Sequence, residues 1–287
     1  SAFSSAITIY IVIPLLMIPM MLLSGAMFPF DKLNRKVGNI DKVPVIAELM
    51  PTRWTYEALM VRQAKDNEYD KRVYSLKKRI SVADFNSVYR IARLNEALER
   101  CINQKKFSIA GETEPELDLL SNELENLHIN YHVPLFSGAD SLTPALFNVN
   151  LGERLGKYLS GLNNEFIKQS NIADDELDRY VSDNKQSLKT LYDNYHNDKL
   201  DEIVRKVYEP DKILEYRERL IQNVDPIYQE PWPERPLEFR CQFFAPVKKI
   251  MGFTIDTFTF NISLVLLSVV VLYLMLYYET LPKIIRS

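Results

Sequence analysis

TFTFNISLVLLSVVVLYLMLYY, residues Thr257 to Tyr278, is a stretch without a single charged side chain. It exceeds the roughly 20 apolar residues that an α-helix needs to cross about 30 Å of hydrocarbon. Phe258 and Phe260 stand near one end, and Tyr277 and Tyr278 stand at the other. This placement is typical of the aromatic belts at the two membrane interfaces. The sequence therefore predicts a transmembrane helix here.

A second uncharged stretch lies near the other end of the chain. AITIYIVIPLLMIPMMLLSGAMF runs from Ala6 to Phe28, and no charged residue occurs anywhere from Ser1 to Phe30. Pro14 and Pro19 would each remove a hydrogen bond from a helix in a soluble protein. Membrane helices tolerate proline better, because neighbouring helices satisfy the freed carbonyl groups. A buried core helix is the alternative, but such helices are rarely so long and so uncharged. We therefore predict a second transmembrane helix.

The short segment after the last apolar stretch sets the predicted orientation. Leu281 to Arg286 is basic, and basic flanks favour the cytoplasmic side of a membrane. Two spans then place residues 31–256 outside the cytoplasm. The chain starts without Met, a basic n-region or a cleavage pattern, so a cut within a longer protein is expected rather than a signal peptide.

The residues between the two apolar stretches carry nearly all of the charge. The net charge is only −3 at pH 7, and no dense face of Lys and Arg stands out, so nucleic acid is not an expected partner. Apolar residues at helical spacing predict helices in Ser81–Ile102, Thr113–Leu127, Leu177–Tyr195, Ile203–Tyr208 and Ile213–Val224. Pro and Gly predict irregular structure in His132–Ala145 and Pro226–Pro236. Alternating polarity predicts a short strand in Leu237–Phe243.

The expected fold is mainly α, with two transmembrane helices that flank a large inserted extracytoplasmic α-helical domain and at most a short strand pair. The expected division of the chain is a first transmembrane helix (1–30), a re-entrant or interfacial helical connector (31–72), the extracytoplasmic helical insert (73–236), a return connector (237–256), the last transmembrane helix (257–280) and a cytoplasmic tail (281–287).

Motifs of catalysis are not found in this sequence. It contains no GxxxxGK[ST] phosphate loop and no HExxH zinc motif, and neither a nucleophile motif nor a carboxylate pair stands out. His128 and His132 are spaced to share one helix face, but Pro134 follows closely, so solvated histidines are favoured over metal ligands. No catalytic residue, metal ligand or cofactor is expected within this fragment.

Cys101 and Cys241 are the only cysteines. In a periplasmic loop they could form a disulfide that closes a long loop and ties the start of the domain to its end. Two buried free thiols are the alternative, which the position of Cys101 on an apolar helix face favours.

Two stretches carry a likeness to a known family. The first runs from LSGAMFPFDKLN (Leu23–Asn34) through MPTRWTYEALM (Met50–Met60) to Asn67-Glu68-Tyr69. The second is the tail RCQFFAPVKKIMGFTIDTFTFN (Arg240–Asn261). Together they resemble the end of the permease domain of ABC-2 type transporters of the ABCG (White/pigment) subfamily. The arrangement is similar to bacterial ATP-binding/permease fusions, especially those of Bacteroidota. The residues between the two stretches depart from the eukaryotic pattern, in which this external loop is short.

The resemblance implies an ATP-driven exporter in the bacterial inner membrane, with the central domain in the periplasm. ATP and Mg would bind to a nucleotide-binding domain elsewhere in the full-length protein, and the chain would pack with lipid, with the remaining permease helices and with a second copy in a homodimer. The family's exit plug of two leucines would correspond to Ala26 and Met27, a smaller residue and a thioether. Gly25, just before them, is a further gate candidate, and the alternative is a small residue that permits close helix packing or a turn at the membrane edge. The connector residues Arg53, Trp54, Tyr56 and Glu57 would anchor at the membrane interface.

Two other classes of protein share this topology. One is a membrane sensor whose external ligand-binding domain lies between two membrane helices. The other is a scaffold that grips an envelope partner. Pro14, Pro19 and the apolar segment Val43–Pro51 count against the sensor, because that segment is typical of a return to the membrane. We expect the helical domain to lie over the permease exit and to limit or direct release.

Overall fold

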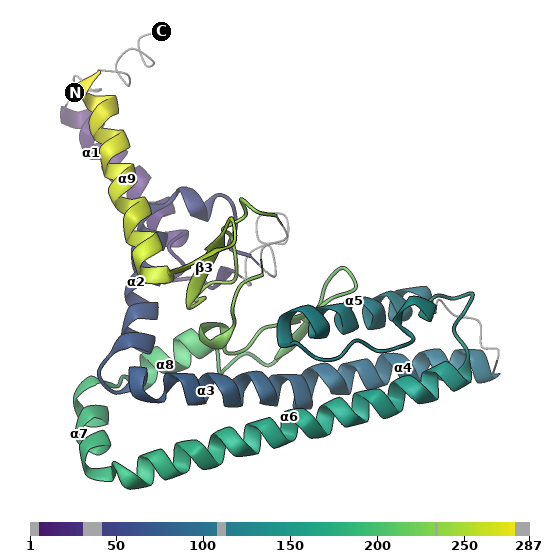
Figure 1. Cartoon of the computed structure of the whole chain (residues 1–287). Coiled ribbons are helices and arrows are strands. Elements are labelled where there is room, and N and C mark those ends of the chain that lie inside the picture. The colour runs from purple at the N-terminus through teal and green to yellow at the C-terminus, as the bar shows by residue number, and fades with distance from the viewer. Residues whose placement is uncertain (1–5, 31–41, 108–112, 233–234, 279–287) are drawn as a thin grey trace. The chain divides into compact units, whose positions relative to one another are not determined.

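The computed structural model of the chain describes residues 6–30, 42–107, 113–232 and 235–278 (Figure 1). The fold is mainly α with two short antiparallel strand pairs among these residues, which confirms the mainly helical class. The chain divides into two compact units. The first, here called the terminal unit, comprises Ser1–Asp70, His196–Val204 and Gln229–Ser287. The second, here called the helical arm, comprises Lys71–Tyr195 and Arg205–Tyr228. The finer division expected from the sequence stays a prediction.

Two apolar helices belong to the terminal unit. Helix α9 (Thr257–Tyr277) is long and apolar enough to cross a membrane, and only a small part of it is buried within the protein. Helix α1 (Ala6–Leu22) contains both prolines but is shorter, and at about 1.5 Å per residue its 17 residues reach roughly 26 Å. The structure thus has one long apolar helix at the C-terminal end and a shorter one near the N-terminus.

Helix α1 ends earlier than the apolar stretch from Ala6 to Phe28 because the backbone turns at Gly25, whose φ of +81° is open to glycine but strained for other residues. The Ser24 hydroxyl donates to the Met21 carbonyl at 2.7 Å and accepts from the Ala26 amide at 3.1 Å. A Cβ atom on Gly25 would lie 2.7 Å from the Phe243 ring. Glycine is therefore required here both by the turn and by the close approach of an aromatic ring.

The rest of the terminal unit packs around the start of α9. The short 3-10 helix η2 (Ala47–Leu49) leads into α2 (Pro51–Asp66), whose first residue is proline, and α2 packs along α9. Strands β3 (Val247–Ile250) and β4 (Phe253–Asp256) form a hairpin in which Val247 pairs with Asp256 and Ile250 pairs with Phe253. The Asp256 side chain caps α9 by accepting from the Phe258 amide at 3.0 Å. Helix α8 (Asp198–Arg205) adds most of its residues to this unit.

The strand expected at Leu237–Phe243 is wrong, since this segment has no regular structure and the strands lie further on, at β3 and β4. Instead of a ladder of strand hydrogen bonds, the segment makes an isolated backbone bond, in which the Cys241 carbonyl accepts from the Val43 amide at 3.1 Å. Phe244 follows with a φ of 66°. The alternation of apolar residues reflects separate contacts, because Cys241 is buried while Leu237 is 70% exposed.

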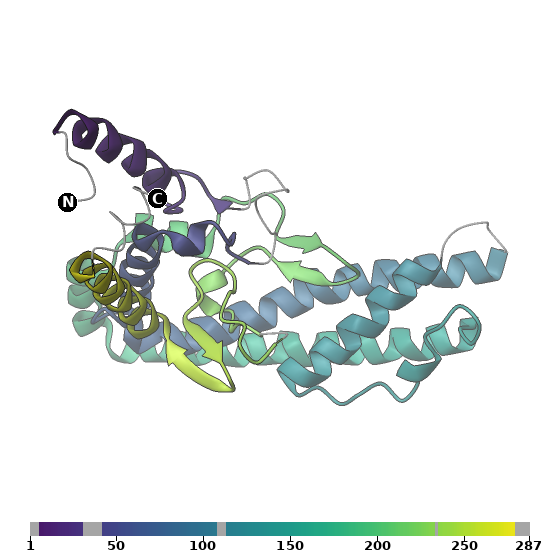
Figure 2. The same ribbon diagram turned by 90° about the horizontal axis from the view of Figure 1, so that it is seen from above.

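The helical arm is built from long helices. Helix α3 (Asp70–Asp84) continues through the π-helical turn η3 (Phe85–Arg90) into α4 (Ile91–Phe107), which packs against α5 (Glu114–Tyr131) and α6 (Val149–Asp183). Helix α7 (Lys185–Tyr195) follows α6 after a break at Asn184. The segment between α5 and α6 is irregular apart from η4 (Ala139–Ser141), as expected, and η5 (Pro226–Tyr228) closes the arm. Figure 2 shows α3, α4 and α6 running along the length of the arm.

One apolar core holds the arm together. It is lined mainly by leucines of α4, α5 and α6, and its fully buried members are Leu94, Ala97, Cys101, Leu117, Leu119, Leu120, Leu127, Leu155 and Leu159. A buried ion pair lies beside it, where the Arg90 guanidinium reaches Glu123 at 3.2 Å. Glu123 also accepts from the Leu220 amide at 2.8 Å. Burial lowers the pKa of Arg90, but the charge of Glu123 and the nearby Tyr131 outweigh it and raise the pKa.

Two helix predictions in the arm are wrong. The helix expected at Ile213–Val224 is a hairpin of β1 (Ile213–Glu215) and β2 (Leu220–Gln222), in which Leu214 pairs with Ile221. The spacing of the apolar residues fits the period of a helix or that of a strand, and the buried hydrogen bond from the Leu220 amide to Glu123 favours the strand. The helix expected at Leu177–Tyr195 is two helices, because Asn184 ends α6.

Candidate functional site: a buried polar cluster in the terminal unit

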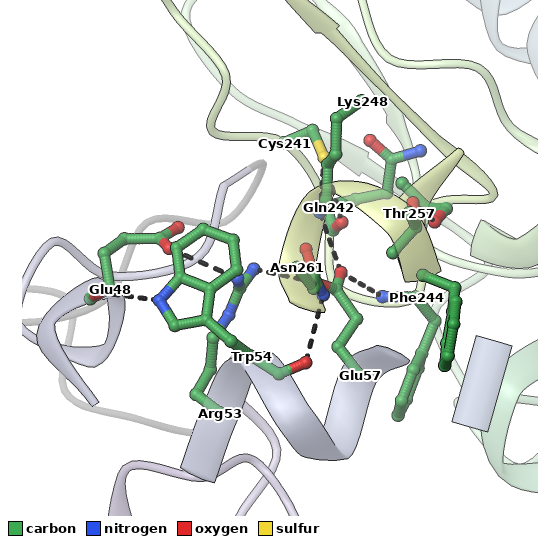
Figure 3. Close-up of polar contacts among 12 residues, drawn as sticks. Glu48, Arg53, Trp54, Glu57, Cys241, Gln242, Phe244, Lys248, Thr257 and Asn261 are labelled. Carbon is green, nitrogen blue, oxygen red and sulfur yellow. Dashed lines mark hydrogen bonds and ion pairs between the residues drawn. The ribbon is translucent and has the colours of Figure 1, made fainter. Parts of the chain in front are cut away.

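Charged and polar side chains from three elements meet inside the terminal unit (Figure 3). Helix α2 supplies Arg53 and Glu57, strand β3 supplies Lys248 and helix α9 supplies Asn261. None of these four side chains is more than 1% exposed. Charged residues are almost never so completely buried unless they are paired, so the cluster is a built feature of the fold.

Glu57 is the centre of the cluster. Its Oε1 atom accepts from Lys248 Nζ at 2.8 Å and from the Phe244 amide at 3.2 Å. Its Oε2 atom accepts from Asn261 Nδ2 at 2.7 Å and lies 3.3 Å from an Arg53 guanidinium nitrogen. A single carboxylate therefore contacts α2, the segment before β3, β3 itself and α9.

The other side of Arg53 faces the segment before α2. An Arg53 nitrogen lies 3.2 Å from a carboxylate oxygen of Glu48, and the guanidinium lies 4.0 Å from the centre of the Trp54 ring. Trp54 Nε1 donates to the Glu48 carbonyl at 2.9 Å, and Asn261 Nδ2 also approaches the Trp54 carbonyl at 3.2 Å. Figure 3 shows the tryptophan ring beside the guanidinium. These contacts extend the cluster from η2 to α9.

The charges of the cluster balance, with Arg53 and Lys248 facing Glu48 and Glu57. Burial alone would raise the pKa of Glu57, but the charges of Arg53 and Lys248 and the hydrogen bonds from Lys248 and Asn261 outweigh it and lower the pKa. Burial raises the pKa of Glu48, and the charge of Arg53 offsets this only in part. The lowered pKa favours the carboxylate form of Glu57. Burial lowers the pKa of Lys248, but the electrostatic influence of Cys241 and of Glu57 outweighs it and raises the pKa.

The polar atoms of the cluster are not all satisfied. Both carboxylate oxygens of Glu48, two nitrogens of Arg53 and the Asn261 Oδ1 atom are buried without a hydrogen bond of good geometry. Waters commonly fill such positions in proteins, since a water needs only a few polar partners. Each unsatisfied atom leaves the network less stable than its contact list suggests.

Cys241 joins the cluster through Lys248, whose Nζ atom lies 3.2 Å from the thiol sulfur. Burial raises the pKa of Cys241 despite the nearby ammonium group. Cys101 lies in the arm core, and burial raises its pKa to about 11. Both cysteines are free and buried in this structure, so the candidate disulfide between them is not formed. Buried thiols with raised pKa values are poor nucleophiles.

The structure brings together three of the four predicted connector residues. Arg53, Trp54 and Glu57 point into the cluster, whereas Tyr56 is half-buried against the Phe243 and Phe244 rings at 6.1 Å. The sequence did not single out Glu48, Lys248 or Asn261. A signal was present for Asn261, because an amide side chain inside an otherwise apolar span needs a polar partner.

The predicted gate residues lie in the turn after α1. Gly25 is half-buried, while Ala26 is exposed and Met27 is 55% exposed. They take no part in the polar cluster, and their role as an exit plug stays a prediction.

The contacts of the cluster support the fold of the terminal unit. Within the described ranges, no group of three or more His, Cys, Asp and Glu side chains is placed to hold a metal ion. His128 contacts the Val133 carbonyl at 2.7 Å, and His132 ends α5 in the left-handed conformation. The cluster fixes the start of α9 against α2 and the β3–β4 hairpin.

Lys248→Met should destabilise the terminal unit by about 3–5 kcal/mol, because removing one partner of a buried ion pair leaves the other charge uncompensated. The matched control is Lys199→Met, since the Lys199 side chain is 80% exposed beside Glu202 and exposed pairs contribute about 0–1 kcal/mol. Unfolding in detergent or nanodiscs, followed by circular dichroism, checks the difference. Equal stability of the two variants would contradict the role assigned to the cluster.

Comparisons with known proteins return no family model, no curated protein and no solved structure that matches this chain.

Proposed function

We propose that this chain is part of the transmembrane permease of an ATP-driven exporter of the ABC-2 type, with the helical arm on the non-cytoplasmic side over the exit. One observation carries the proposal. The two stretches that resemble the family, Met50–Met60 and Arg240–Asn261, lie far apart in the sequence, yet they supply Arg53, Glu57, Lys248 and Asn261 to one buried cluster.

The residues between the two stretches have the character of an insertion. The arm has a core of its own, and the chain segments at its base are tied together within the terminal unit. Asp70 accepts from Asn67 Nδ2 at 2.7 Å and lies 2.7 Å from His196 Nδ1. The Tyr69 and His196 rings are 5.4 Å apart. These contacts join the points at which the chain first enters and first leaves the arm, to which it returns from Arg205 to Tyr228.

In this proposal α1 and α9 are both membrane helices, and the tail after α9 is cytoplasmic. The shorter α1 would span with help from its neighbours, since a short apolar helix is accommodated by local thinning of the bilayer or by flanking residues. The whole protein would be a homodimer in the bacterial inner membrane. ATP and Mg would bind to its nucleotide-binding domain, and the cluster would hold α9 rigid while the domains move.

The complete protein that contains this chain should hydrolyse ATP in a Mg-dependent manner after reconstitution in liposomes. Its gene should encode a phosphate loop and four further membrane spans upstream of this segment. A kinase or methyl-accepting domain downstream, together with no ATP hydrolysis, would instead identify a sensor and overturn the exporter proposal.

The arm should be reachable from outside the cell. Glu153 is exposed on α6 and both native cysteines are buried, so Glu153→Cys creates one accessible thiol. A membrane-impermeant maleimide should label this variant in intact cells and should barely label the parent protein. Labelling only after the cells are broken would reverse the orientation assigned to the arm.

Shortening the arm should change export while the protein still inserts into the membrane. Ser170 on α6 donates to Asp84 at the end of α3 at 2.5 Å. A short Gly/Ser linker in place of residues 86–168 can therefore join α3 directly to the rest of α6. Leu220→Ser is added because Leu220 belongs to the core that the deletion removes. Efflux of a panel of fluorescent dyes from cells is measured beside the amount of protein in the membrane. Unchanged efflux of every dye at equal protein levels would show that the arm plays no part in release.

A further inference from the structure

Four large apolar side chains in and just before the β3–β4 hairpin are half or more exposed. They are Trp232, Leu237, Met251 and Phe253, with exposed fractions of 50%, 70%, 63% and 71%. They belong to the β3–β4 hairpin and to the segment before it, and they are called here the hairpin tip. Single exposed apolar residues are normal in proteins, but several at one place mark an interaction site.

The hairpin tip has a defined backbone conformation and specific contacts. Met251 and Gly252 form the two-residue turn with φ values of 50° and 82°, which suits the right-handed twist of a hairpin. The Met251 amide donates to the Pro236 carbonyl at 2.6 Å, which joins the turn to the segment that holds Leu237. Lys249 Nζ lies 3.8 Å from the centre of the Trp232 ring and 3.1 Å from Glu230. These contacts hold the apolar side chains outward.

The hairpin tip lies close to the beginning of α9. Strand β4 ends at Asp256 and α9 begins at Thr257, so Phe253 lies only four positions before the first residue of the helix. At about 3.3 Å per residue these four steps span roughly 13 Å at most. Figures 1 and 2 show the hairpin extending sideways from the first turn of α9 rather than along the helix axis. A lateral position at this depth is the level of the lipid headgroups if α9 crosses the bilayer.

Charged residues mark the same level on the neighbouring helix. The Arg62 guanidinium lies 5.4 Å from the centre of the Phe258 ring. Lys65 pairs with Asp256 at the very start of α9. Charged groups belong in the headgroup zone or in water, and apolar residues of α9 follow directly. The membrane surface is therefore expected near the first turns of α9.

We propose that the hairpin tip inserts its apolar side chains into the headgroup zone of the leaflet in which α9 begins. This inference rests on the membrane insertion of α9 contained in the proposed function. Its occupant is lipid because the tip combines an indole, a phenyl ring and two flexible aliphatic side chains with a lysine, and such amphipathic sets are enriched at membrane interfaces. The tip would contact the membrane surface beside α9, and this contact would fix the tilt of α9 and the height of the buried cluster above the bilayer.

The two tryptophans of the chain allow a direct test, because Trp54 is only 6% exposed within the cluster and Trp232 is 50% exposed. The protein is reconstituted in phosphatidylcholine/phosphatidylglycerol vesicles whose acyl chains are brominated either near the headgroup or near the methyl end. The fluorescence emission of Trp232 is obtained by subtracting the emission of the Trp232→Phe variant from that of the parent protein. Shallow bromines should reduce this emission roughly twofold or more, and deep bromines should reduce it less, since interfacial rings lie at headgroup level.

Variants of the tip separate lipid contact from folding. Phe253→Asp should weaken the quenching of Trp232 by shallow bromines and increase its quenching by acrylamide in water. The matched control is Phe107→Asp, because Phe107 is 63% exposed at the end of α4 in the arm, and it should leave both values unchanged. Circular dichroism shows that each variant keeps its helices.

Flotation of the vesicles separates this inference from the proposed function. Protein that does not float with the vesicles overturns the membrane insertion of α9 and the inference with it. Protein that floats but shows acrylamide quenching without bromine quenching has a tip in water, and the inference alone is wrong. Quenching by neither agent places protein over the tip, either a second copy or another permease segment, and this also overturns lipid contact.

Discussion

A carboxylate buried away from bulk solvent needs positive charge and hydrogen-bond donors nearby, and Glu57 imposes this requirement on the terminal unit. Its partners come from places that only the folded chain brings together: Lys248 on β3, Asn261 on α9 and the Phe244 amide. The desolvation of such a group costs several kcal/mol unless its partners are well placed. The position of α9 is therefore set by electrostatics at one end and is left open along the rest of its length, where its side chains are exposed.

The sequence predicts the apolar helices and the helical character of the arm because these depend on local composition and periodicity. Thr257–Tyr278 needs no tertiary information to be recognised, and the structure has α9 there. The predictions fail where a distant partner decides. The pattern of Ile213–Val224 predicts a helix, but the bond from the Leu220 amide to Glu123 favours a strand. The pattern of Leu237–Phe243 predicts a strand, but the Cys241 carbonyl accepts from the Val43 amide instead of from a strand partner.

Only part of the candidate site could be predicted from the sequence. Arg53, Trp54 and Glu57 stand out because they lie together on one helix, although the sequence suggested an interfacial role for them and the structure buries them. Lys248 looks like one of two equivalent lysines, and only the hairpin register separates it from Lys249. In that register Lys248 pairs with Ile255 and faces inward, while Lys249 pairs with Thr254 on the opposite face. A one-residue slip would exchange the two.

The cluster also explains how an apolar helix can begin inside a protein. The first two turns of α9 carry Thr257 and Asn261, and both side chains are fully buried. Each donates a hydrogen bond to protein: Thr257 to the Ala245 carbonyl at 2.6 Å, and Asn261 to Glu57. Beyond them the helix has few polar side chains, and Ser263 and Ser268 bond back to their own helix. The side-chain donors of Thr257, Asn261, Ser263 and Ser268 are thus bonded either to the terminal unit or to the helix itself, while the Asn261 Oδ1 atom is left without a partner among the described residues. That division is the one expected where a chain passes from a polar environment into hydrocarbon, because hydrocarbon offers no hydrogen bonds to replace those that protein and water supply.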